Sequence, residues 1–166
     1  LIQKKSPQTT TETLIPDFRG DMNSLRTVLE SGVTILNNNV ETVPSLYREV
    51  RPEADFEQSL NIIRNTKNMS SGIYTKSGLM AGLGETFEEL VSVFKQLHSA
   101  GCDCLTIGQY LAPSEESYPV KRYVRPREFE DMKKAAESCG ISRVYAGPFV
   151  RSSYNAEQLL NQIKES

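Results

Sequence analysis

Cysteine and histidine are scarce in this sequence, which has three cysteines and one histidine among 166 residues. Cys102, Cys104 and Cys139 are odd in number and follow no regular framework, which argues against a disulfide-stapled fold. On a strand, Cys102 and Cys104 would share one face as small buried residues. We prefer that interpretation to a metal role, because two ligands cannot close the usual four-ligand site. His98 is expected near a helix end rather than at a metal.

The sequence also lacks a strong positive charge, a long apolar run and a visible secretory signal at residues 1–5. A net charge of -2 gives no support for a nucleic-acid-binding surface, and no stretch approaches the roughly 20 apolar residues of a membrane span. With 38% hydrophobic residues, the chain can form one domain with a core. We therefore expect a soluble protein that binds neither nucleic acid nor membrane, cytoplasmic in a bacterium or mitochondrial or plastid in a eukaryote.

Glycine and proline divide the chain into alternating strand and helix patterns. Thr86 and Glu89 form a capping box at the start of one helix, and Thr42 is expected to cap a short helix through Val43 and Pro44. The alternation predicts one α/β domain with parallel strands, either a complete or partial barrel or a doubly wound sheet. Apolar spacing predicts strands at 13–15, 33–36, 73–80, 105–107 and 143–146, and helices at 21–31, 54–68, 86–98, 127–139 and 155–164.

Polar residues gather at 37–42, 75–77, 108–110 and 147–154, beside or within the predicted strands. In both architectures the functional loops follow the carboxyl ends of the strands. We therefore expect a site for a polar ligand at one edge of the sheet. The residues expected to meet there are Asn37, Lys76, Gln109 and Ser153.

Several of these polar residues also have a plain structural interpretation. The asparagines at 37–39 suit a turn, and Arg48 and Arg51 suit helix ends facing solvent. Lys76 within an apolar strand must be paired or face a cavity, which favours a functional role. Arg151 beside two serines fits an anion site or a loop anchor equally well. Gly82-Leu-Gly84 lacks the third glycine of a dinucleotide fingerprint. Physical chemistry alone thus predicts an α/β enzyme or ligand-binding domain of unknown substrate.

Seven segments together resemble the second half of the lipoyl synthase family, whose members are radical S-adenosylmethionine enzymes. They occur in family order over nearly the whole chain, and Asn38 stands where the family usually has histidine. The chain does not begin with methionine and starts within an apparent helix, so we expect a truncated protein. The segments are 15–20 (IPDFRG), 37–43 (NNNVETV), 47–52 (YREVRP), 75–86 (TKSGLMAGLGET), 105–113 (LTIGQYLAP), 122–126 (RYVRP) and 147–154 (GPFVRSSY).

The resemblance implies a fold and an activity. The fold would be a partial (β/α)6 barrel with parallel strands, of which residues 1–166 form the C-terminal part of the radical S-adenosylmethionine core and a C-terminal cluster-ligating segment. The activity would be a sulfurtransferase that inserts sulfur at C6 and C8 of a protein-bound octanoyl group. The implied cofactors are S-adenosylmethionine and two 4Fe–4S clusters. The implied partners are octanoylated lipoyl carrier domains, namely 2-oxoacid dehydrogenase E2 subunits and the glycine cleavage H protein.

The family holds its clusters with Cys-x4-Cys-x5-Cys and Cys-x3-Cys-x2-Cys in the N-terminal half, and neither motif occurs here. We therefore expect this chain alone to bind no complete cluster and to be inactive. The alternative is a truncated, non-catalytic relative that binds a lipoyl carrier domain or a partner subunit. An unrelated barrel enzyme would leave the seven segments unexplained.

The resemblance also implies site residues, none of them a general acid or base. The pattern from Gly78 to Glu85 is similar to a stretch that packs near adenine, and the strand end after residue 36 faces the ribose and methionine. Ser153 would be a cluster ligand, with a helix cap as the alternative interpretation. The implied cofactor-binding residues are Asn37, Asn39, Glu41, Lys76, Ser77, Gly78, Met80, Gly82, Glu85 and Arg151.

Overall fold

A five-stranded parallel sheet is the centre of the computed structural model, which describes residues 2–153. The strands lie side by side in their order along the chain, and every neighbouring pair is parallel. Every predicted strand is present, so the parallel α/β prediction is confirmed; the predicted helix 155–164 lies outside the described residues. The strands are β1 (Glu12–Leu14), β2 (Ile35–Asn37), β3 (Tyr74–Ala81), β4 (Cys104–Gln109) and β5 (Arg143–Gly147).

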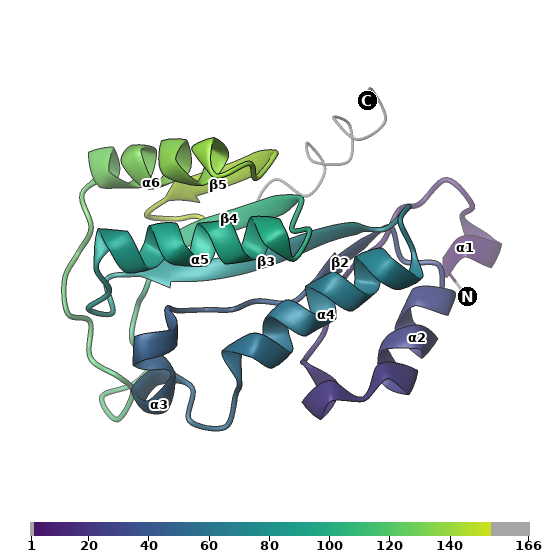
Figure 1. Cartoon of the computed structure of the whole chain (residues 1–166), viewed down its shortest axis with the longest axis horizontal. Helices are drawn as coiled ribbons and strands as arrows, with labels where there is room; N and C mark the ends of the chain where they lie inside the picture. Colours follow the sequence, from purple (N-terminus) through teal and green to yellow (C-terminus); the bar gives the residue numbers. More distant parts are fainter. Residues whose placement is uncertain (1, 154–166) are drawn as a thin grey trace.

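The long helices decide between the two predicted architectures. Figure 1 shows α2, α4, α5 and α6 on the same face of the sheet. A doubly wound sheet carries helices on both faces, whereas sequential parallel strands with helices on one side are typical of a barrel segment. The helices are α1 (Ile2–Lys5), α2 (Met22–Glu30), α3 (Tyr47–Val50), α4 (Phe56–Met69), α5 (Phe87–Ser99) and α6 (Pro126–Ser138), with 3-10 turns η1 (Phe18–Gly20) and η2 (Pro44–Leu46).

Local capping explains where several helices begin. The predicted capping box at the start of α5 is confirmed, because Thr86 accepts from the amide of Glu89 while Glu89 accepts from that of Thr86. The prediction for Thr42 is wrong. The turn η2 begins after Val43 without a side-chain cap, and the Thr42 hydroxyl is buried with no described hydrogen-bond partner. Pro44, at the first position of the turn, has no N–H to donate.

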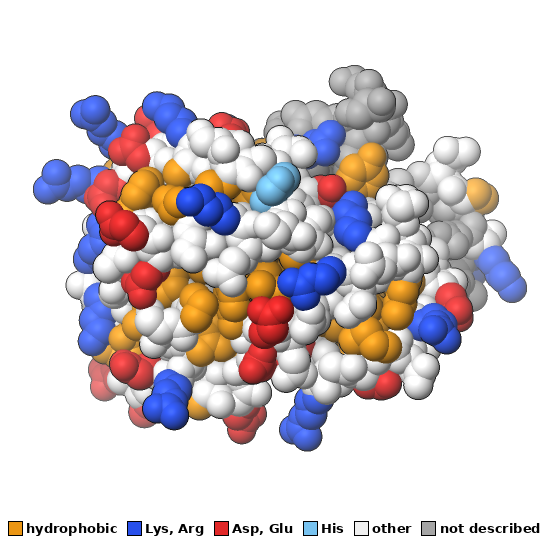
Figure 2. All heavy atoms as spheres, in the orientation of Figure 1, with side chains coloured by type: hydrophobic (Ala, Val, Ile, Leu, Met, Phe, Trp, Pro, Cys, Tyr) orange, Lys and Arg blue, Asp and Glu red, His pale blue; other side chains and the backbone are white. Residues whose placement is uncertain are grey.

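The two faces of the sheet differ in what covers them. Alternate strand residues such as Leu36, Leu105 and Ile107 are fully buried in the cores that include the helix residues. The helix side shows apolar seams between the helices and interspersed charges of both signs (Figure 2). Since successive strand residues point to opposite faces, the remaining strand residues face away from the helices. We call this second side the open face; it carries Ile35, Asn37, Lys76, Gly78, Cys104 and Thr106.

The two neighbouring cysteines do not share a face, so that prediction is wrong. β4 begins at Cys104, and Cys102 precedes it in the turn after α5. Cys102 therefore packs into the main core beneath the helices, whereas Cys104 contacts Ile35 on the open face. Both are buried free thiols, as expected for small hydrophobic residues.

The predicted meeting of polar residues at one edge is only partly realised. Asn37, the last residue of β2, pairs with Lys76, but both lie far from Gln109. Lys76 is the third residue of β3 and pairs with Cys104, the first residue of β4. Gln109 pairs instead with Ala81, five residues farther along β3, which is about 16 Å at the usual rise of a strand. Gln109 also bonds to Arg122 and Val124 in the loop before α6.

Candidate functional site

The chain leaves β2 along the side of β3 and places three asparagines and a glutamate there. Beyond Asn37, the backbone N–H of Asn38 donates to Lys76 O at 3.0 Å, and the backbone N–H of Glu41 donates to Gly78 O at 2.9 Å. Glu41 adopts a left-handed backbone conformation with φ of 64°, which is uncommon outside glycine. Such a conformation costs roughly 1 kcal/mol and persists where the surroundings enforce it, commonly at functional sites.

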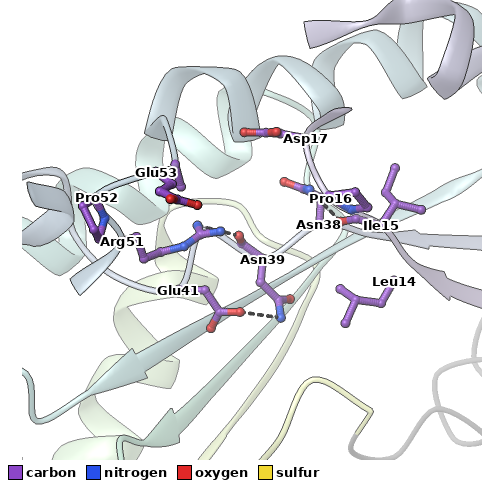
Figure 3. A pocket seen from close by; sticks show the side chains of 11 residues that line it. Leu14, Ile15, Pro16, Asp17, Asn38, Asn39, Glu41, Arg51, Pro52 and Glu53 are labelled. Carbon is purple, nitrogen blue, oxygen red and sulfur yellow. Dashed lines mark hydrogen bonds between the residues drawn. The ribbon is translucent and has the colours of Figure 1, made fainter. Parts of the chain in front are cut away.

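The side chain of Asn39 packs on β3 at Gly78, which has no side chain. Its Nδ2 donates to Glu41 Oε1 at 3.0 Å, as the dashed line in Figure 3 shows. A Cβ on Gly78 would lie only 2.7 Å from Asn39 Oδ1, so glycine is needed for this close approach. The Oδ1 atoms of Asn37, Asn38 and Asn39 are buried and have no hydrogen-bond partner among the described residues. Such acceptors call for a donor, which a ligand can supply.

The larger cavity, of about 740 Å³, lies at the carboxyl ends of β1 and β2 and is called here the charged cavity. Figure 3 shows the carboxylates of Asp17 and Glu53 at its rim, the guanidinium of Arg51 and the amide of Asn38. It can therefore receive groups of both charges. Its lining residues are Leu14, Ile15, Pro16, Asp17, Asn38, Asn39, Glu41, Arg51, Pro52, Glu53 and Ala54.

Arg51 lines this cavity and is held there by hydrogen bonds, so its interpretation as a helix-end cation facing solvent is wrong. Its Nη1 donates to the carbonyls of Asn39 and Val40 and to Tyr47 Oη, each at 3.2 Å. Burial raises the pKa of Tyr47, so it is a neutral phenol that donates to Val40 O at 2.6 Å. Pro52 was the sequence signal that Arg51 does not continue the helix, because a proline disfavours helical backbone at the residue before it.

A second cavity, of about 300 Å³, lies beside the first over β3 and β4 and is called here the strand cavity. Asn39 and Glu41 line both cavities and so form their common wall. The structure thus brings five of the implied cofactor-binding residues, Asn39, Glu41, Gly78, Met80 and Arg151, together with Gln109 around the two cavities. The strand cavity is lined by Asn39, Glu41, Gly78, Leu79, Met80, Thr106, Gly108, Gln109, Leu111, Val150, Arg151 and Ser152.

Lys76, Asn37 and Ser77 line neither cavity. Lys76 is fully buried, and its Nζ lies 3.0 and 3.2 Å from the two carboxylate oxygens of Glu12. Asn37 Nδ2 donates to the same carboxylate at 3.3 Å, and Ser77 Oγ accepts from the amide of Val40 at 3.2 Å. The structural alternative for Lys76, pairing with a counterion, is therefore realised; its cofactor role stays a prediction.

Gly82 and Glu85 build the turn after β3. The Glu85 carboxylate accepts from three backbone amides, those of residues 82, 83 and 84, at 2.7 to 3.0 Å. Gly82 has φ of 98°, and a Cβ there would collide with Arg122 O and the Gln109 side chain. Both residues therefore shape the end of β3, which carries Gly78 and Met80 to the strand cavity.

The loop from 148 to 153 closes the strand cavity from the β5 side. Arg151 is exposed and its Nη1 donates to Val150 O at 2.7 Å, so it anchors its own loop. Ser152 lines the cavity, and Ser153 is an exposed residue next to it. Both this loop and Gly108 are among the polar segments expected from the sequence, but the packing of the loop against Gly108 was not predicted.

The described residues do not fit a complete 4Fe–4S cluster. Between residues 2 and 153, no three His, Cys, Asp or Glu side chains are grouped to hold a metal ion. Burial raises the pKa of Cys104 to about 12 and also raises that of Cys102, so both disfavour the thiolate that a cluster needs. Also within this range, no helix is long and apolar enough to span a membrane.

Comparison with known proteins gives close sequence relatives. The lipoyl synthase of Alkaliphilus metalliredigens is 49% identical over 164 residues, which are 99% of this chain and 57% of that protein. Those of Caldicellulosiruptor saccharolyticus and Chlorobium phaeobacteroides are each 52% identical over 95% of the chain and 55% of their own length. This chain is a relative of the lipoyl synthases. The family predicted from the seven segments is confirmed, and the chain spans about half the length of these lipoyl synthases.

No family model matches the chain. Among solved structures, the crystal structure of methylornithine synthase matches 99% of the chain and 59% of its own length, with a TM-score of 0.62. At 14% identity this match concerns the fold alone. The fold predicted from the resemblance to lipoyl synthases is confirmed.

Proposed function

We propose that the chain is part of a lipoyl synthase that inserts sulfur at C6 and C8 of a protein-bound octanoyl group by S-adenosylmethionine radical chemistry. Sequence identity of 49 to 52% with lipoyl synthases over nearly the whole chain supports this proposal. The chain would supply the C-terminal part of the radical core and the segment with Ser153. When bound, 4Fe–4S clusters held by cysteines outside this sequence would supply the electron and the sulfur.

The observation that carries the proposal is the pair of cavities with a common wall. S-adenosylmethionine has a zwitterionic methionine end, a ribose with two hydroxyls and a flat adenine. Arg51 would bind the carboxylate in the charged cavity, and Asp17 and Glu53 would attract the ammonium group. The hydroxyls would meet Asn39 and Glu41 in the common wall.

The buried, unpaired Oδ1 atoms of Asn38 and Asn39 support this fit, since each needs a donor. Gly78 and Met80 leave room and an apolar surface for a flat ring in the strand cavity. In this proposal the chain's own residues bind and orient the ligand, and none of them moves a proton. Lys76, Ser77 and Asn37 line neither cavity, so they would support the sheet behind the site without touching the ligand. Glu85 would support it from the turn in the same way.

The test of this site is ligand binding by the full-length protein that contains this chain. Asn39→Ala should weaken S-adenosylmethionine binding by about ten- to a hundredfold, because a buried hydrogen-bonding group is lost. Asn23→Ala, an exposed asparagine on α2, is the matched control and should bind normally. Equal affinity of both variants in isothermal titration calorimetry would refute the assignment.

The proposal gives Ser153 the role of one iron ligand. In the full-length protein, Ser153→Ala should leave cleavage of S-adenosylmethionine largely intact, yet stop the formation of lipoyl groups. Ser142→Ala is the control, because Ser142 is exposed and lines neither cavity, and it should form lipoyl groups normally. Normal lipoyl formation by Ser153→Ala would leave Ser153 with a structural role only.

Further proposals rest on the same assignment. The partners would be octanoylated carrier domains of 2-oxoacid dehydrogenase E2 subunits and of the glycine cleavage H protein, and the enzyme would act in the bacterial cytoplasm or in an organelle. The chain alone would not cleave S-adenosylmethionine. Reconstitution of the chain with iron and sulfide checks this, and formation of 5′-deoxyadenosine would contradict it.

A further inference from the structure

Gly108 lies on the open face of β4, where the loop from 148 to 153 packs against the strand. Its backbone is not left-handed, so its φ gives no reason for a glycine. A Cβ at this position would fall well within 3.0 Å of the carbonyl oxygen of Val150, closer than real Cβ atoms come to other atoms. It would also lie 3.1 Å from Arg151 Nη1. The close approach of the loop is therefore the reason for the missing side chain.

The backbone of Val150, whose carbonyl approaches Gly108, also makes hydrogen bonds in and next to the loop from 148 to 153. Val150 O accepts from Arg151 Nη1 at 2.7 Å, and the amide of Val150 donates to Gly147 O at 3.1 Å. The Val150 side chain is buried, whereas Phe149 beside it is 87% exposed. Val150 is thus the residue through which this loop rests on the sheet.

We propose that Gly108 is a positioning residue that sets the height of this loop over the strand cavity. The inference rests on the proposed function, because the loop carries Arg151, Ser152 and Ser153. Any side chain at 108 must push the Val150 carbonyl away from β4, since its obstacle is backbone rather than a flexible side chain. Misplacement of a functional group by 1 Å can cost about a hundredfold in rate.

Hydrogen exchange of the full-length protein, without added iron or S-adenosylmethionine, tests the positioning directly. Gly108→Ala should raise exchange at the Val150 amide, which bonds to Gly147 O, by about tenfold, while amides of α5 and α6 stay protected. The matched control is Gly147→Ala. Gly147 pairs with Gly108 across the sheet, but its Cβ would meet only Val150 Cγ2 at an ordinary 3.4 Å. Unchanged loop exchange in Gly108→Ala, or an equal rise in Gly147→Ala, would overturn the proposal.

A second variant covers the case in which Gly108→Ala unfolds the protein. Val150→Ala removes most of the buried side chain through which the loop packs but adds no atoms to the sheet. It should also raise exchange in the loop alone, and unchanged exchange there would refute the docking through Val150.

Iron content after anaerobic purification separates this inference from the proposed function. If both hold, Gly108→Ala should lose about one iron per chain, the iron that Ser153 would bind, and Gly147→Ala none. A released loop with unchanged iron would leave Gly108 as the loop's support but refute the iron-ligand role of the loop.

Discussion

Replacing Lys76 shows what the buried ion pair on the open face contributes. Lys76 is fully buried, its Nζ lies 3.0 Å from a Glu12 oxygen, and the Glu12 side chain is only 16% exposed. Lys76→Met keeps the apolar stem and removes the charge. Glu12 would then be a nearly buried carboxylate with one amide donor, Asn37. Breaking a buried pair in this way costs about 3–5 kcal/mol of unfolding free energy, and we expect the lower end because Glu12 is partly exposed.

Removing both charges should recover most of the unfolding free energy that Lys76→Met loses. The double variant Glu12→Gln with Lys76→Met leaves no unpaired charge, and replacing a whole buried pair is often neutral to within about 1 kcal/mol. Lys133→Met is the control, because Lys133 and Glu137 are 3.8 Å apart and about half exposed on α6. An exposed pair contributes roughly 0–1 kcal/mol.

Urea unfolding of the full-length protein, followed by circular dichroism, measures each loss from the midpoint at constant slope. A loss below about 1 kcal/mol for Lys76→Met would refute the reasoning, as would a double variant no more stable than the single one. Titration of the double variant with S-adenosylmethionine then tests the predicted cofactor role of Lys76. Because Lys76 lines neither cavity, we expect unchanged affinity.

Three further predictions concern the site and the cysteines. Glu41→Gly should relieve the left-handed strain and stabilise the fold by up to about 1 kcal/mol in urea, yet weaken S-adenosylmethionine binding in calorimetry. Glu85→Ala should cost about 2–3 kcal/mol in urea, because three amides lose a charged acceptor, and a loss as small as that of Lys133→Met would contradict this. Burial raises the pKa of Cys104 to about 12, so at pH 8 only about one in ten thousand molecules has the thiolate, and mass spectrometry should find iodoacetamide on the half-buried Cys139 before Cys104.

The sequence by itself determined the order and type of the elements and the family. The capping box of Thr86 and Glu89 formed as predicted, and each predicted strand lies within two residues of its observed start. These features depend on residues close together in the chain, and caps and apolar periodicity act over only three or four positions. The seven family segments are likewise short stretches of sequence, so they and their order could be identified without the structure.

The tertiary structure alone decided how distant residues meet. Helices on one face settled the barrel over the doubly wound sheet, because periodicity does not say on which side of a sheet a helix packs. The register of β3 against its neighbours placed Lys76 beside Asn37 and Glu12 but far from Gln109. The path of the chain after α3 brought Arg51 into the charged cavity. The side-chain bonds of Arg51 to backbone carbonyls and of Lys76 to Glu12 join residues 11 to 64 positions apart, and such contacts form only when the sheet assembles.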